Sequence, residues 1–188
     1  MQIPKTDQIN IWKWVHALDS FEHADYALIA IIKNDAKDIK MFKNILTAFF
    51  VNYAKPFGNN RGIGSLDTDI ISKEFIPYHK EILDYRHKFF AHSDLNAVSI
   101  KDNEFIDNMQ IIIEDGRLNW QLRHYFPTTD QFNKYQYLLD KLITKCNYHI
   151  NKLNTKYLSN IDWPDGKYHL NIRDESNLTF SKLEQKPI

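Results

Sequence analysis

The chain has 188 residues, in which 24 lysines and arginines balance 24 aspartates and glutamates. This length fits a single domain with a sizeable core. The balanced charge excludes a wholly basic surface of the kind that holds nucleic acid nonspecifically, although it leaves room for a local basic cleft. Aromatic residues make up 14% of the sequence, which favours a bulky packed core over disorder.

The cysteine content and the length of the apolar runs exclude several further classes of protein. Cys146 is the single cysteine, so the chain has neither a disulfide framework nor a cysteine-based zinc site. The first residues lack the pattern of a signal peptide, and apolar runs such as residues 45–51 are too short to span a bilayer. We therefore expect a cytoplasmic protein without a membrane segment, a metal site or a cofactor.

Two long helices are predicted in the first third of the chain. Apolar residues recur at helical spacing over residues 7–33, with Thr6 or Asp7 as the expected N-cap. Whether the helix breaks at residues 19–20 stays open. A second apolar stripe predicts a helix over residues 35–54, which must end before Pro56 because the residue preceding a proline disfavours the helical conformation.

A loop and a third helix follow. Residues 56–65 (PFGNNRGIGS) form the richest Gly and Asn stretch in the chain and are predicted to be a loop. Residues 65–75 are expected to be helical in part. Pro77 then opens a helix over residues 76–92, at a first-turn position where proline is tolerated.

The last third combines a β-hairpin with a long helix. Residues 109–114 and 118–126 are rich in β-formers and flank an Asp-Gly turn, which predicts a hairpin. A stripe about seven turns long predicts a helix over residues 129–158, capped at residues 128–130. Residues 161–188 are expected to be an extended or partly disordered tail with one short strand near residues 168–172.

The sum is a mainly α protein. We predict one domain over residues 1–160, an up-and-down bundle of about four long helices with a hairpin inserted before the last helix.

The third helix mixes charged groups into an apolar segment. Arg86 and His92 lie six positions apart, which places them about 120° apart around the helix axis. One helix can therefore offer both side chains to a shared cleft, but from different faces. A single chain is thus not expected to complete such a site alone.

The motif around these two residues is RHKFFAHSD (86–94), an arginine and a histidine separated by five residues near the end of a bundle helix. It resembles the signature of the HEPN superfamily of nucleotide-binding domains. Together with the preceding segment VNYAKPF, it is similar to small bacterial and phage abortive-infection proteins of that superfamily. The resemblance covers about residues 35–158, with the hairpin as a departure from the bare bundle.

The resemblance implies a homodimer in which the two motif helices, residues 76–92, face one another. It also implies a metal-independent endoribonuclease with a toxin or phage-defence role. The residue types suit this chemistry, because histidine titrates near neutrality and the planar guanidinium matches phosphate oxygens. We expect His92 to transfer the proton and Arg86 to stabilise the charge of the phosphorane. Further residues expected to support catalysis or to contact RNA are Tyr85, His87, Asp94, Lys88 and Arg61.

Other interpretations stay open at this stage. Arg86 can serve to neutralise a nearby acid, and His92 can cap a helix end where its charge is favoured. The protein can then be a noncatalytic dimerisation or interaction module, or a nucleotide-binding partner of a nucleotidyltransferase. In the toxin role, an antitoxin is a possible partner. Asp84 and His87 form only half of the motif that holds two metal ions in a helical bundle, so a metal site is not expected. Cys146 lies on an apolar stripe, which favours a core role.

Overall fold

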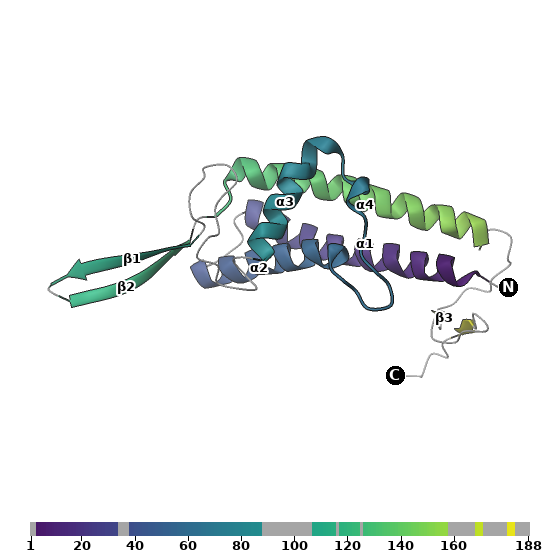
Figure 1. Ribbon diagram of the computed structural model, residues 1–188, viewed down its shortest axis with the longest axis horizontal. Helices are drawn as coiled ribbons and strands as arrows, with labels where there is room; N and C mark the ends of the chain where they lie inside the picture. The colour runs from purple at the N-terminus through teal and green to yellow at the C-terminus, as the bar shows by residue number, and fades with distance from the viewer. Residues whose placement is uncertain are drawn as a thin grey trace.

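The computed structural model confirms the mainly helical bundle with a hairpin before the last helix (Figure 1). It describes residues 3–33, 38–87, 107–115, 117–124, 126–157, 168–170 and 180–182. The four α-helices of this part are α1 (Lys5–Ile32), α2 (Ile39–Ala54), α3 (Ile76–Asp84) and α4 (Thr129–Tyr157). Short 3₁₀ turns lie between α2 and α3, over Lys55–Phe57, Thr68–Ile70 and Lys73–Phe75.

The helices α1 and α4 form the frame of the bundle. They lie side by side and run in opposite directions, while α2 packs along one half of α1 and α3 crosses between α2 and α4 (Figure 1). At the end of this frame, the Asp7 carboxylate accepts hydrogen bonds from Lys156 Nζ at 2.7 Å and from the Tyr157 hydroxyl. These bonds lower the pKa of Asp7. None of the described helices combines the length and the apolar character needed to cross a bilayer.

Two predicted helix starts are wrong. The helix α1 begins at Lys5 after Pro4 and not at the expected cap, Thr6 or Asp7, and it runs without a break through Ser20. The Ser20 hydroxyl donates to the His16 carbonyl, which satisfies it inside the helix. The second helix begins at Ile39 because the Asp38 carboxylate caps the Met41 amide, and residues 34–37 lie outside the described part.

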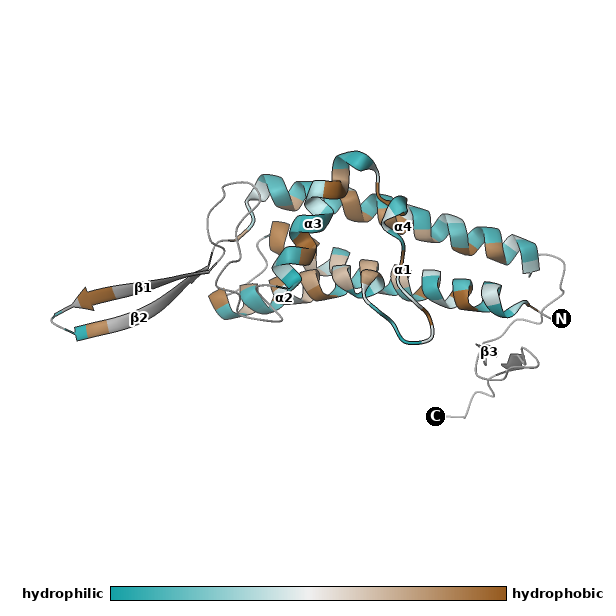
Figure 2. Ribbon diagram, viewed as in Figure 1, coloured by the Kyte–Doolittle hydropathy of each residue, from teal (hydrophilic) through white to brown (hydrophobic). Residues whose placement is uncertain are grey.

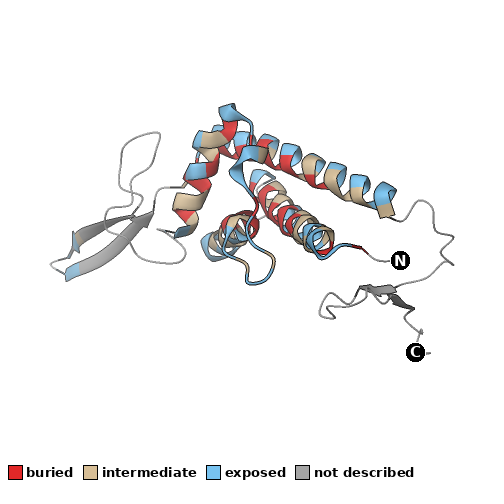
Figure 3. Cartoon of the chain, turned by 45° about the vertical axis from the view of Figure 1, so that its right-hand side comes forward, coloured by how far each residue is buried: buried red, intermediate tan, exposed pale blue. Residues whose placement is uncertain are grey.

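The core is built largely from aromatic side chains of α1, α2 and α4. Phe49 and Phe50 of α2 are fully buried and lie 4.9 Å apart between ring centroids, and Tyr135 of α4 packs against both. The buried residues lie on the helix faces that are turned toward the interior of the bundle (Figure 3), and the apolar residues follow the same faces (Figure 2). Burial of each such ring contributes about 2–3 kcal/mol before entropy is counted, so these contacts dominate the stability of the fold.

A buried polar network fixes α3 to the start of α4. The Glu81 side chain is 5% exposed and accepts hydrogen bonds from Gln131 Nε2 and from the Tyr135 hydroxyl, both at 2.7 Å. Gln131 also accepts from the Thr128 amide while the Thr128 hydroxyl caps the Gln131 amide, a capping box that starts α4. Burial and the Glu81 carboxylate raise the pKa of Tyr135, which keeps its hydroxyl protonated as the donor.

The hairpin projects from the end of the bundle where α4 begins (Figure 1). It pairs β1 (Asp107–Glu114) with β2 (Arg117–His124) in antiparallel register, with Ile111 opposite Trp120. Asp115 takes a positive φ of 50° in the turn, as expected for the predicted Asp-Gly. The tail strand predicted near residues 168–172 is β3 (Tyr168–Leu170), and it pairs with a strand that was not predicted, β4 (Phe180–Lys182).

The Glu81 network yields a stability prediction. Replacing Glu81 by alanine leaves the Tyr135 hydroxyl and the Gln131 amide without their buried acceptor, so we expect a loss of about 3 kcal/mol in the free energy of unfolding. Chemical denaturation measures it. The control is Glu74→Ala, an exposed glutamate one turn before α3, which should change stability by less than about 0.5 kcal/mol. Equal effects of the two substitutions would contradict a structural role for Glu81.

Candidate functional site

The candidate site begins where α3 changes its helical geometry. After Asp84 the chain continues through a wider π-helical turn at residues 85–87, a feature often found at functional sites. Tyr85 turns inward, and Arg86 is half-buried while His87 is exposed. Arg86 Nη1 lies 3.0 Å from His87 Nδ1. Because a guanidinium can only donate, His87 Nδ1 is the acceptor in this hydrogen bond, which orients the Arg86 side chain.

Arg86 and His87 open into a cleft of about 370 Å³, here named the Arg86 cleft. Its volume lies at the lower end of the range of about 300–1,000 Å³ occupied by small-molecule sites. It is bounded by the end of α2, the end of α3 and the turn between them. The described residues that line it are Val51, Ala54, Lys55, Phe57, Gly58, Asn59, Asn60, Leu83, Arg86 and His87.

The charge of the Arg86 cleft favours an anion. Lys55 and Arg86 contribute two cations, and none of the described lining residues is an aspartate or a glutamate. The two carboxamides of Asn59 and Asn60 add hydrogen-bond donors and acceptors. The cleft thus concentrates positive charge locally on a chain whose net charge is zero.

The sequence shapes the turn that forms one wall of the cleft. Pro56 ends α2 and is buried in the 3₁₀ turn Lys55–Phe57. The Lys55 carbonyl then accepts from the Gly58 amide at 3.2 Å and from Asn60 Nδ2 at 3.1 Å, which holds the turn closed. Gly62 adopts a φ of 81°, in the left-handed region that favours glycine, and the chain then returns to the turn, where the Leu66 amide donates to the Pro56 carbonyl at 2.9 Å.

Phe57 connects the cleft to the core. Its ring is half-buried and contacts Phe21, Tyr53 and His79 at centroid distances of 5.8, 5.7 and 4.6 Å. His79 is 3% exposed, and its Nδ1 shares a hydrogen bond of 3.0 Å with the Tyr53 hydroxyl. Burial lowers the pKa of His79 to about 4, with a smaller contribution from Lys80. His79 is therefore a neutral core residue that supports the wall of the cleft.

The structure separates the residues predicted from the sequence. Arg86 and His87 meet in the cleft, whereas Tyr85 is 2% exposed and stacks on Phe50 at 4.9 Å. Tyr85 therefore belongs to the core, and the expected contact with phosphate does not fit its burial. Arg61 is exposed and lies just beyond the turn that lines the cleft. The predictions for Lys88, His92 and Asp94 concern residues outside the described part of the chain.

Sequence reasoning missed the opposite wall, formed by Lys55, Phe57, Asn59 and Asn60. The signal that could have found it is the spacing of Val51, Ala54 and Lys55, which share one face of α2 as it reaches Pro56. Only the packing of α2 against α3 shows that this face lies beside Leu83 and Arg86.

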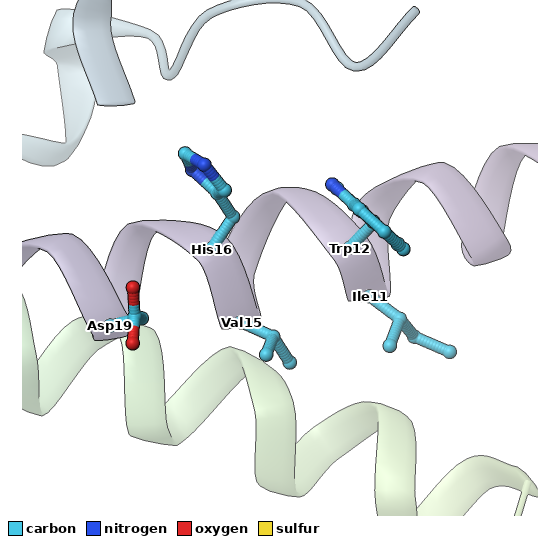
Figure 4. A pocket seen from close by; sticks show the side chains of 5 residues that line it. All are labelled: Ile11, Trp12, Val15, His16 and Asp19. Atoms are coloured by element: carbon cyan, nitrogen blue, oxygen red, sulfur yellow. The ribbon is translucent and has the colours of Figure 1, made fainter. Parts of the chain in front are cut away.

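A second hollow lies on the exposed face of α1, and all of its described lining residues belong to that helix (Figure 4). Trp12 and Val15 are 42% and 48% exposed there, with Ile11, His16 and Asp19 beside them. Asp19 is engaged with His23 at 3.7 Å. This surface is mainly apolar and brings together no set of groups for catalysis, so it suits a protein contact better than a chemical site.

Comparison of the chain with family models, with curated proteins and with solved structures gives no match.

The buried neutral His79 predicts a loss of stability in acid. The folded state holds its pKa near 4, below the ordinary value of 6.5, so the unfolded chain binds the proton more readily. Stability contributed by this residue is fully present above pH 6.5 and falls as the pH drops toward 4. The loss should reach about 2 kcal/mol at pH 5.

Denaturation midpoints measured between pH 7.5 and 4.5 check this dependence. The variant His79→Gln should flatten the profile over that window. The control His23→Gln, at an exposed position of α1, should keep the slope of the unmodified protein. An unchanged slope in His79→Gln would show that another group causes the acid sensitivity.

Proposed function

We propose that the protein is a metal-independent endoribonuclease of the HEPN type, which acts as a homodimer with a toxin or phage-defence role in the cytoplasm. The observation that carries the proposal is the position of Arg86. Its half-buried guanidinium lies in a cleft with a second cation, Lys55, and with no acidic residue among the described lining. A fixed guanidinium in such surroundings suits a phosphodiester, because its planar donors match phosphate oxygens in pairs.

The proposed reaction uses the RNA's own 2′-hydroxyl. A base removes the 2′-hydroxyl proton, the 2′-oxygen forms a bond to the adjacent phosphorus, and the bond from phosphorus to the 5′-oxygen breaks as that oxygen takes up a proton. The products are a 2′,3′-cyclic phosphate and a 5′-hydroxyl. Arg86 stabilises the charge of the phosphorane, and we assign the proton transfer to His92 on the basis of the resemblance.

The dimer in this proposal supplies a second copy of the same pair of residues. The motif helices, residues 76–92, would face one another, so that each cleft is completed by the partner chain. This explains why a pair on different faces of one helix can still act on one phosphate. An antitoxin that covers the Arg86 cleft would silence the activity.

A noncatalytic interaction module is the second candidate function. The observation that favours it is the apolar α1 surface around Trp12 and Val15 (Figure 4), which can bind a partner protein, such as a nucleotidyltransferase, without any chemistry. In this case the Arg86 cleft would bind a nucleotide or remain a structural feature. Purified protein would then leave RNA intact with and without added metal ions.

The proposal predicts that Arg86→Gln and His92→Gln each lower the rate of RNA cleavage by about 100-fold or more, because each removes a group that acts in the transition state. The measurement uses a fluorescent RNA in buffer containing a chelator, with product ends identified by mass. Both variants should also relieve growth inhibition when the protein is expressed in bacteria.

The control is Lys134→Gln, at an exposed position of α4, which should retain full cleavage. The melting temperature of each variant is measured beside its activity. If Arg86→Gln and His92→Gln lose activity only in proportion to the protein that unfolds, the two residues are structural and the proposal fails.

A further inference from the structure

The Arg86 cleft has two chemically distinct halves. Lys55 and Arg86 provide positive charge, while Phe57 offers an aromatic ring and Asn59 and Asn60 offer carboxamides. A nucleotide presents the matching parts, since its phosphate is anionic, its base has a π-face and its base edge carries donors and acceptors. Cations alone would suffice to bind a simple anion, whereas cations combined with an aromatic ring and carboxamides match a nucleotide.

We propose that the segment Lys55–Asn60 forms the wall of the Arg86 cleft that selects the base of a bound nucleotide, here named the base-selecting wall. Phe57 supports the base of the nucleotide whose phosphate contacts Arg86, and Asn59 reads the edge of that base. The ligand is one nucleotide unit of single-stranded RNA. The inference rests on the proposed function, because it takes the anion bound by Arg86 to be a phosphodiester of RNA.

The packing of Phe57 makes it suitable for this role. Three aromatic neighbours hold its ring from the core side, and the residue also lines the cleft. A ring held in this way loses little conformational freedom when a base packs against it. Leu83 and Val51 line the cleft as well and supply apolar surface that excludes water from the base.

The two asparagines differ in their freedom to bind a ligand. Asn60 Nδ2 donates to the Lys55 carbonyl, and the Asn60 carbonyl accepts from the Ile63 and Gly64 amides, so Asn60 is needed to hold the turn. Asn59 is exposed and lines the cleft next to it. A carboxamide carries both a donor and an acceptor, which is what a pattern on a base edge requires. Asn59 is therefore the residue assigned to base selection.

Binding is tested without cleavage, by titrating the full-length protein with four 2′-O-methyl oligonucleotides that each contain a single type of base. The 2′-O-methyl group removes the nucleophile, so failure to cleave RNA cannot disturb the result. We expect at least a 10-fold preference for one base. Asn59→Ala should reduce that preference to below 3-fold, and Phe57→Leu should weaken binding of the preferred oligonucleotide by about 5- to 100-fold.

Three controls keep the roles apart. Lys55→Gln should weaken all four oligonucleotides alike and reduce the salt dependence of binding. Lys40→Gln, at the exposed start of α2, should change none of these values. Melting temperatures show whether Phe57→Leu remains folded. If it does not, Asn59→Ala at an exposed position still decides the question.

The proposal is overturned by equal binding of all four oligonucleotides or by an unchanged base preference in Asn59→Ala. A free nucleotide that binds as tightly as the same base within an oligonucleotide would also overturn the assignment to RNA. Base-selective binding of oligonucleotides combined with intact RNA in the cleavage assay would instead contradict the proposed ribonuclease and leave the base-selecting wall in place.

Discussion

The position of α3 depends on the buried contacts made by Glu81. This short helix carries the candidate site, yet it contributes only a small part of the apolar core. Its carboxylate at Glu81 binds the first two turns of α4 through Gln131 and Tyr135, both at 2.7 Å. A carboxylate with 5% exposure is costly to bury, and it becomes tolerable only where donors surround it. The network therefore fixes the register between α3 and α4.

A second buried contact sets the other side of α3. His79, Leu83 and Arg86 recur at i, i+4 and i+7, so they lie along one face of the helix. His79 packs under Phe57, and Leu83 and Arg86 line the cleft beyond it. Within two turns, the same face of the helix thus contributes first to the core and then to the cleft. The wider turn at residues 85–87 then sends Tyr85 inward and leaves Arg86 at the cleft.

Much of the fold could be predicted from the sequence. The stripe of α2, the Pro56 stop, the Asp-Gly hairpin and the Thr128 cap all depend on local patterns, and the structure shows each of them. The start of α1 could not be predicted, because Asp7 forms a long-range pair with Lys156 and leaves the cap to Pro4. The strand pair β3–β4 also depends on chain segments that local patterns do not connect.

Of the candidate site, only the residues at the end of α3 could be predicted from the sequence. Arg86 and His87 could be selected from a motif, but the polar side chains that α3 buries are His79 and Glu81, whose roles are structural. Sequence periodicity gives the face of a helix and not its neighbour, so the wall formed by Lys55 and Asn59 was missed. Tyr85 carries a hydroxyl that suits phosphate and stands next to Arg86 in the sequence, but neighbouring residues on a helix point about 100° apart, and Tyr85 is buried in the core.

The proposed function requires that the Arg86 cleft bind the phosphodiester of RNA. The most direct measurement is a crystal structure of the protein with a short 2′-O-methyl RNA that cannot be cleaved. A phosphate of this RNA should lie within hydrogen-bond distance of Arg86, with the adjacent base on the Phe57 side of the cleft. If the RNA binds elsewhere and the Arg86 guanidinium contacts His87 but no phosphate, the proposed function is contradicted.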